Sequence, residues 1–265
     1  MRVFQIVVAR SGFGCTMALS MASGAVAEPE KMSEFARLTG IVWSPELAFR
    51  DVAARPRWWP PLVLIVLLSL VFHYMFNQRG GWEHFFRQQS ETNTQMQKMP
   101  ADQREQIMAK QIQFAPIMGY VGSVVGIPLA ALVIGGVFLL VFKMFLGAAL
   151  SFRQAFAITS YAMIPLVFST AMTLVMLQLK DPSEFDLQYP TLTNIGAFLD
   201  SVNTPKWLLS LATSIDAFTL WILALLATGF SAAARKISWS TAMAYVVGTW
   251  SVYVLLKVGW AAMFG

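Results

Sequence analysis

Five long stretches of this chain contain almost no charged side chains, and each is long enough to cross a lipid bilayer. They cover residues 58–78, 117–142, 154–179, 207–234 and 237–263. A membrane-spanning α-helix needs roughly 20 consecutive, mostly apolar residues. Strands of a membrane barrel would instead alternate apolar and polar residues over about ten positions. The sequence therefore predicts an all-α fold, a polytopic transmembrane helix bundle with about five spanning helices.

The overall composition supports a membrane location. The chain is 57% hydrophobic and 12% charged, whereas soluble domains typically carry about 25% charged residues. So little charge cannot cover a water-facing surface, and the apolar excess must face lipid. The net charge of +5 comes from basic residues spread over the connections between apolar stretches, where membrane insertion favours them. We therefore expect the lipid bilayer as a partner and no nucleic acid.

The positive charges also predict an orientation. Arg50, Arg55 and Arg57 precede the first stretch, and Arg235 and Lys236 follow the fourth without a nearby acid. Basic residues favour the cytoplasmic side of a membrane. The N-terminus is therefore predicted in the cytoplasm and the C-terminus outside. The connection between the first and second stretches does not follow this rule, because it carries several basic residues, mixed with acids, on the outer side.

Residues 1–31 differ from the rest of the chain and allow two interpretations. They contain a mildly apolar stretch that ends in Ala25-Val26-Ala27, which is similar to a weak signal-peptide cleavage site. Cleavage there would invert the predicted orientation. Alternatively, these residues are an upstream extension of the reading frame, and synthesis begins at Met32 or Met21.

The membrane domain comprises residues 58–263, and three segments before or within it are expected to lie outside the spanning helices. Residues 32–57 predict cytoplasmic interfacial helices, one of which begins at a capping Ser44, continues through a proline, and ends near Pro56. Between residues 102 and 114, apolar side chains recur at helical spacing, which predicts a short amphipathic helix on the membrane or on the mouth of the bundle. The connection 181–206 contains three prolines and predicts an irregular cap over the helix ends.

Sequence signatures of enzymes are absent. The two histidines, His73 and His84, are not part of an H-E-x-x-H motif, and two donors are too few for a zinc site. Neither a G-x-S-x-G motif nor a phosphate-binding glycine loop occurs. We therefore predict no enzyme activity, no cofactor and no metal, and we interpret His73, which has aromatic neighbours, as a membrane-interface residue.

Two charged residues interrupt the apolar stretches, Asp216 in the fourth and Lys257 in the fifth. Charges inside a membrane segment are candidates for function. A rise of about 1.5 Å per residue places both at similar depths, within reach of a lysine side chain. One hypothesis is an ion pair between the two helices. The alternative is that Lys257 extends to the outer head groups while Asp216 caps a neighbouring polar group.

Small residues and prolines mark the second and third stretches. Gly122 and Gly126 form a G-x-x-x-G step, which allows close helix packing in lipid, either within the chain or with another protein. Pro128 and Pro165 predict interruptions of these helices, which serve either packing or gating.

Four short segments are informative: residues 44–56, 151–156, 161–165 and 216–221. They resemble the Yip-domain (Ypt-interacting protein) family of five-span membrane proteins, in its bacterial branch. The likeness covers roughly residues 40–263, without the connection 78–116. The resemblance implies five spans, a cytoplasmic N-terminus and no established active site. The positions that match the family motif are then bundle-forming residues: Tyr161, Pro165, Asp216, Phe218 and Trp221.

The resemblance also implies a class of function. Eukaryotic relatives bind Rab-type GTPases, and some bacterial relatives act alongside ABC-type exporters. We therefore expect a non-enzymatic scaffold or accessory subunit in the bacterial inner (cytoplasmic) membrane, with a membrane-protein partner such as an ABC-type exporter. The sequence also allows a homo-oligomer. The alternative is a transporter or lipid-moving protein that uses Asp216 and Lys257 in a polar pathway.

Overall fold

The computed structural model describes residues 31–92, 94–181, 185–187, 189–200, 203–234 and 236–264. The expected N-terminal segment 1–31, apart from Lys31, and Arg235 lie outside the described residues. Residues 1–31 and 32–265 are separate units of the chain. Within the described residues the fold is all helical, which confirms the predicted fold class, and the β-pairing there is a single bridge between Asn194 and Asp216.

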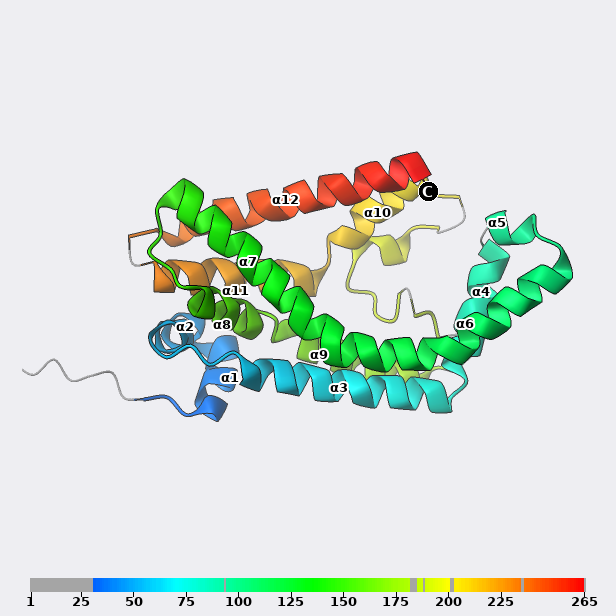
Figure 1. The fold of residues 1–265 in the computed structure, drawn as a ribbon, viewed down its shortest axis with the longest axis horizontal. Helices are drawn as coiled ribbons and strands as arrows, with labels where there is room; N and C mark the ends of the chain where they lie inside the picture. Colours follow the sequence, from blue (N-terminus) through cyan, green and yellow to red (C-terminus); the bar gives the residue numbers. More distant parts are fainter. Residues whose placement is uncertain are drawn as a thin grey trace, which may run out of the picture. The chain divides into compact units, whose positions relative to one another are not determined.

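The helices follow one another closely along the chain (Figure 1). The first half contains α1 (Glu34–Trp43), α2 (Pro45–Ala54), α3 (Trp59–Gln78), α4 (Gly81–Thr92), α5 (Thr94–Gln97), α6 (Ala101–Val121), the π-helical turn η1 (Gly122–Gly126) and α7 (Ile127–Leu146). The second half contains α8 (Phe152–Ala162), α9 (Pro165–Leu179), the 3₁₀ helix η2 (Ile195–Phe198), α10 (Lys206–Ser214), α11 (Ala217–Ala233) and α12 (Trp239–Phe264).

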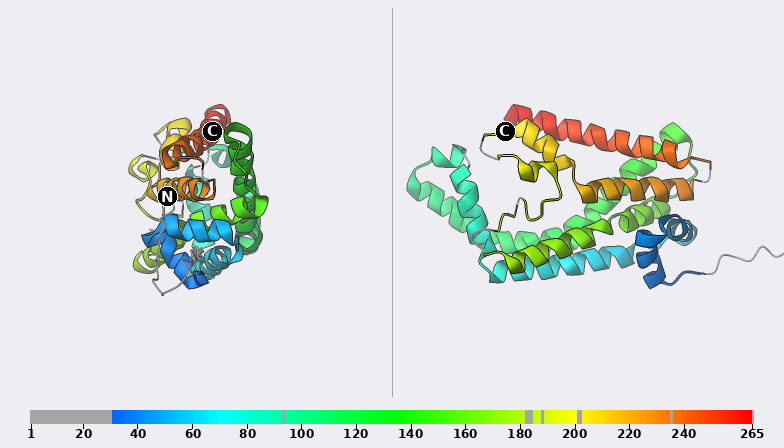
Figure 2. Two further views of the ribbon diagram at one scale, coloured as in Figure 1. Left: turned by 90° about the vertical axis from the view of Figure 1, so that its left-hand side faces the viewer. Right: turned by 180° about the vertical axis from the view of Figure 1, so that it is seen from behind.

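Four helical segments of the described chain are long and apolar enough to cross a membrane. They are α3, the continuous segment Ala101–Leu146, the pair α8–α9 (Phe152–Leu179) and α12. The predicted interruption at Pro165 is confirmed, because α8 ends at Ala162 and α9 begins at Pro165. The helix α3 packs along α9, and α11 packs along α12 (Figures 1 and 2). The protein is therefore a polytopic helical bundle.

The predicted fourth span, 207–234, is not one continuous helix. It is divided between α10 and the apolar helix α11, and the chain is extended at Ile215 and Asp216. The connection before α10 reaches this break: Ile195 N–H donates to the Ile215 carbonyl, and Ala217 N–H donates to the Thr193 carbonyl. Backbone groups released by a break inside a membrane segment need such partners. This connection therefore does more than cap the helix ends.

The segment 102–114 is also not a separate amphipathic helix. It forms the start of α6, which continues through η1 into α7 without interruption. A π-helical turn inserts an extra residue into a helix and is a common cause of bending. Pro116 lies inside α6, and Pro128 lies at the start of α7. The polar and apolar parts therefore belong to one long helix.

The short helices α1 and α2 form as expected, but α2 is packed into the bundle. Phe49 and Val52 of α2 are fully buried, and α2 packs against α8 and α11. Ser44 precedes α2, yet its side chain forms no capping hydrogen bond, so its predicted role as a capping hydroxyl is wrong. The helix α2 is part of the main hydrophobic core, to which it contributes Phe49.

That core lies between α2, α7, α8, α11 and α12. Phe142 of α7 stacks on Phe230 of α11, with ring centroids 4.5 Å apart. Gly135 of α7 lies against the backbone of Phe156 in α8, and a Cβ there would lie 3.3 Å from the Phe156 Cα atom. Small residues at such points allow helices to approach closely. The core therefore fixes the second half of the bundle around α2.

Candidate functional site

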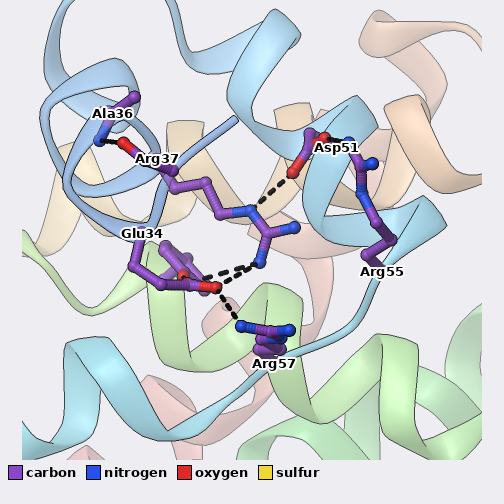
Figure 3. A network of polar contacts seen from close by, with 8 residues as sticks. Glu34, Ala36, Arg37, Asp51, Arg55 and Arg57 are labelled. Atoms are coloured by element: carbon purple, nitrogen blue, oxygen red, sulfur yellow. Dashed lines mark hydrogen bonds and ion pairs between the residues drawn. The ribbon is translucent and has the colours of Figure 1, made fainter. Parts of the chain in front are cut away.

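A cluster of charged side chains lies where α1 and α2 meet (Figure 3). The side chain of Arg37 in α1 is 1% exposed, and that of Asp51 in α2 is 8% exposed. The Arg37 Nε atom donates to the Asp51 Oδ2 atom, and Arg55 forms an ion pair with the other carboxylate oxygen. Asp51 is thus held by two guanidinium groups. Buried charges occur in proteins when they are paired in this way.

Glu34 extends the cluster towards α8. The Arg37 Nη1 atom lies 3.2 Å from the Glu34 Oε1 atom, and the Arg57 Nη1 atom lies 3.0 Å from the same oxygen. The hydroxyl of Tyr161, a fully buried residue of α8, donates to the Glu34 Oε2 atom at 3.0 Å. The cluster therefore joins α1, α2, the connection into α3, and α8 through hydrogen-bonded charges.

From the sequence, Arg55 and Arg57 indicated only the orientation of the chain, and this cluster was not predicted. A signal for it was present, because Glu34 and Arg37 are three residues apart and Asp51 and Arg55 are four apart. Side chains at these spacings are neighbours on a helix. The sequence could not show that the two pairs meet, since this depends on how α1 packs on α2.

The segment 151–156 forms the capped start of α8. The Ser151 side chain accepts from the Gln154 backbone N–H, and the Gln154 side chain accepts from the Ser151 backbone N–H, which is a capping box. The Gln154 Nε2 atom also donates to the carbonyl of Ala53 in α2 at 2.9 Å. Pro165, a buried residue at the start of α9, marks the other end of α8. These family-motif positions therefore place α8 against α2.

Asp216 acts as the N-cap of α11. Its Oδ1 atom accepts from the backbone N–H groups of Phe218 and Thr219 at 2.9 and 3.1 Å, and its Oδ2 atom accepts from the Thr193 hydroxyl at 2.7 Å. One turn further on, the ring of Trp221 packs on Phe168 of α9 at a centroid distance of 5.4 Å. An N-cap carboxylate satisfies amide groups that a helix start leaves unpaired. Asp216 is thus occupied by α11 and by the connection before α10.

Lys257 of α12 points towards α10. Its ammonium group donates to the Ser214 hydroxyl at 3.0 Å, and to the Ser210 carbonyl and the Thr213 hydroxyl at 3.3 Å. Among the described residues, no carboxylate forms an ion pair with it. The ion pair between Asp216 and Lys257 is therefore not present in the structure. Of the alternative, the structure supports the part in which Asp216 is a cap, while Lys257 bonds to α10.

Because Asp216 and Lys257 have separate partners, we expect the effects of Asp216→Ala and Lys257→Met on stability to add. Loss of the cap should lower the free energy of unfolding by about 1 kcal/mol. The double variant should equal the sum of the single changes within about 0.5 kcal/mol. Thermal unfolding in detergent measures all four proteins. A double variant clearly more stable than that sum would reveal an ion pair.

Gly122 and Gly126 lie in the π-helical turn, and both border open space. A Cβ at either position would meet no atom within 4 Å. The glycine step therefore does not pack a helix of this chain. The surface around it is apolar, because Met118, Val121 and Val125 are exposed. We call this surface, formed by Met118, Val121, Gly122, Val125 and Gly126, the glycine face.

A cavity of about 270 Å³ adjoins the glycine face. It is lined by residues of α3, α6 and η1, with Ile127 at the start of α7: Ser69, His73, Met118, Gly119, Gly122, Ser123 and Ile127. The hydroxyls of Ser69 and Ser123 lie 2.7 Å apart, and the His73 ring stacks on Trp82 of α4. His73 therefore belongs to a contact between helices. Among the described residues, no group of three or more His, Cys, Asp or Glu side chains could hold a metal ion.

Comparison with known proteins identifies one family. The model of the Yip1 domain family matches residues 39–261. No curated protein and no solved structure matches the chain. The match includes α2, which carries Asp51 of the charge cluster, and it also includes the capped starts of α8 and α11. The chain therefore belongs to the Yip1 domain family of membrane proteins.

Proposed function

We propose that this protein is a non-enzymatic scaffold or accessory subunit of the bacterial inner membrane that binds a partner membrane protein through its glycine face. The observation that carries the proposal is the outward position of Gly122 and Gly126. Lipid tails gain nothing from a glycine step, whereas a second helix can approach it closely and gain van der Waals contacts. Family membership supports the proposal, since the family is not known for enzyme activity.

Two further features suit a helix as the occupant of the glycine face. The adjoining 270 Å³ cavity has room for a protruding side chain of that helix. The turn η1 is a π-helical insertion, a feature that often occurs at functional sites. On α1, Phe35 and Trp43 are also exposed apolar residues, and they extend the proposed binding surface to the cytoplasmic segments. We expect the partner to be an exporter-like or GTPase-linked membrane protein. If the chain forms a homo-oligomer, the second copy would bind the same face.

We expect the variant Gly122→Leu/Gly126→Leu to lose its partner. Two leucines would fill the space that a helix must enter, and an affinity loss of about tenfold or more follows from a misfit of only about 1.4 kcal/mol. The measurement is purification of the tagged protein in mild detergent, followed by quantification of co-purified membrane proteins. The matched control is Gly248→Leu, because Gly248 is exposed on α12 and also has no neighbour for a Cβ.

Two results would contradict this proposal. One is a wild-type protein that purifies without any stoichiometric membrane-protein partner. The other is equal partner recovery for the glycine-face variant and the Gly248→Leu control. A partner that proves to be a second copy of the chain would instead make the protein a homo-oligomer.

The second candidate function is a transporter or lipid-moving protein. The break between α10 and α11 favours it, because interrupted helices form the binding sites of many transporters. However, the hydroxyls of Ser214 and Thr213 donate to carbonyls of their own helix, as hydroxyls in membrane helices commonly do. The test is flux of ions or labelled lipids in liposomes that contain this protein alone. Flux that Asp216→Asn abolishes would favour the transporter.

A further inference from the structure

A groove between α10 and α12 holds two lysines and lies apart from the glycine face. The two helices pack side by side (Figures 1 and 2), and the residues of α12 that line the groove lie in its last two turns. Its volume is about 550 Å³, within the usual range for small-molecule sites. The residues that matter for its chemistry are Lys206, Ser210, Thr213, Lys257, Trp260 and Phe264.

The ammonium group of Lys257 has hydrogen-bond partners in the groove but no counter-ion. Its three partners are neutral oxygens of α10, and no described carboxylate forms an ion pair with it. A cation inside a membrane segment is costly unless it meets an opposite charge or reaches the head-group region. The arrangement therefore leaves a positive charge that an anion in the groove would neutralise.

Two further residues with hydrogen-bond donors line the same groove. Lys206, the first residue of α10, is exposed. The hydroxyl of Ser210, one turn along α10, is buried and has no hydrogen-bond partner in the structure. Two ammonium groups and a hydroxyl match the several acceptor oxygens of a phosphate group. The start of α10 adds a weak positive field, because a helix N-terminus attracts anions.

The rest of the groove lining is mostly apolar, with Tyr189 as a further polar residue. Trp260 is 64% exposed and Phe264 is 67% exposed, and their rings lie 4.4 Å apart. Aromatic side chains at the end of a membrane helix typically lie at the level of the lipid head groups. A free inorganic anion would gain nothing from these rings, whereas the acyl chains and glycerol of a lipid would cover them.

We propose that the groove between α10 and α12 binds an anionic phospholipid. The phosphate oxygens accept hydrogen bonds from Lys206 and Ser210, the charge of Lys257 attracts the phosphate, and the glycerol and acyl chains lie along Trp260 and Phe264. This site goes beyond the proposed scaffold function, because it recognises a lipid and involves no residue of the glycine face. Loss of lipid binding would leave partner binding through the glycine face untouched, so the two proposals can fail separately.

The test uses the full-length protein and measures its binding to phosphatidylglycerol and phosphatidylcholine in nanodiscs or by native mass spectrometry. We expect a clear preference for phosphatidylglycerol. Lys206→Gln and Lys257→Gln should each reduce phosphatidylglycerol binding about fivefold, which corresponds to about 1 kcal/mol per basic residue near a charged membrane. Ser210→Ala should reduce it without changing the charge. The matched control is Lys143→Gln, since Lys143 is exposed in the last turn of α7 and does not line the groove.

Three outcomes would overturn the proposal. They are equal binding of the two lipids, an equal loss in the Lys143→Gln control, and full displacement of phosphatidylglycerol by inorganic phosphate. The last would indicate a site for a free anion. If Lys257→Gln does not fold, Lys206→Gln and Ser210→Ala decide the question, because Lys206 is exposed and makes no described contact that folding requires.

Discussion

Replacement of Asp51 by leucine is expected to lower the free energy of unfolding by about 3–5 kcal/mol. Asp51 pairs with Arg37, whose side chain is 1% exposed. Without Asp51, the guanidinium group of Arg37 remains buried and keeps only Glu34 as a charged partner. The cost of a buried charge that has lost its partner far exceeds the small net value of the pair. The measurement is unfolding of the purified protein by SDS in mixed micelles.

The same helix offers a matched control. Glu46 and Arg50 of α2 form an ion pair of the same spacing, i and i+4, as Asp51 and Arg55, but their side chains are 67% and 62% exposed. Glu46→Leu should therefore cost at most about 1 kcal/mol. The double variant Arg37→Met/Asp51→Leu should recover part of the lost stability, since it removes both buried charges. Equal losses of unfolding free energy in Asp51→Leu and Glu46→Leu would show that burial of the cluster does not affect stability.

Gly229→Val is expected to destabilise the bundle by about 3 kcal/mol, the upper part of the usual range for overpacking. Gly229 lies in α11, and a Cβ at this position would come within 2.4 Å of the Ile158 Cγ2 atom in α8 and 2.9 Å of the Phe49 Cδ1 atom in α2. Both neighbours are fully buried and have no free space to move into. Three helices would therefore have to separate.

The control for this change is Gly248→Val in α12. Gly248 is exposed, and a Cβ there would meet no atom within 4 Å. A substitution of this kind should change stability by less than about 0.5 kcal/mol. The two variants differ only in position, so thermal unfolding in one detergent compares them directly. Similar melting temperatures for both would contradict the close contact of α2, α8 and α11.

The helix break at Pro165 could be predicted from the sequence, and the break at Asp216 could not. Proline restricts the backbone and has no amide hydrogen, so its effect is local and visible in the sequence. Between α10 and α11 there is neither proline nor glycine at the break. From the sequence, Asp216 had two possible roles, an ion pair with Lys257 or a cap of a neighbouring polar group. In the structure it is the N-cap of α11, a role that an acid before an apolar helix can indicate.

The role of the glycine step likewise depended on tertiary structure. Gly122 and Gly126 were identified as small residues for helix packing, and the structure places them on an outward face. Gly229, which is not part of a G-x-x-x-G step, makes a close contact inside the bundle. A glycine motif indicates that one face of a helix carries no large side chains. Which of several smooth surfaces meets another helix follows from the packing of the whole bundle.

By itself, the sequence determined the solvent of this protein and therefore its class of fold. Long uncharged segments cannot remain in water, and backbone polar groups in lipid must be satisfied within helices. These requirements act along the chain, segment by segment. Only the tertiary structure decided that Arg37 meets Asp51, that Tyr161 binds Glu34, and that Lys257 faces α10. Such contacts join residues far apart in the chain, and they arise from the way apolar helices fit together.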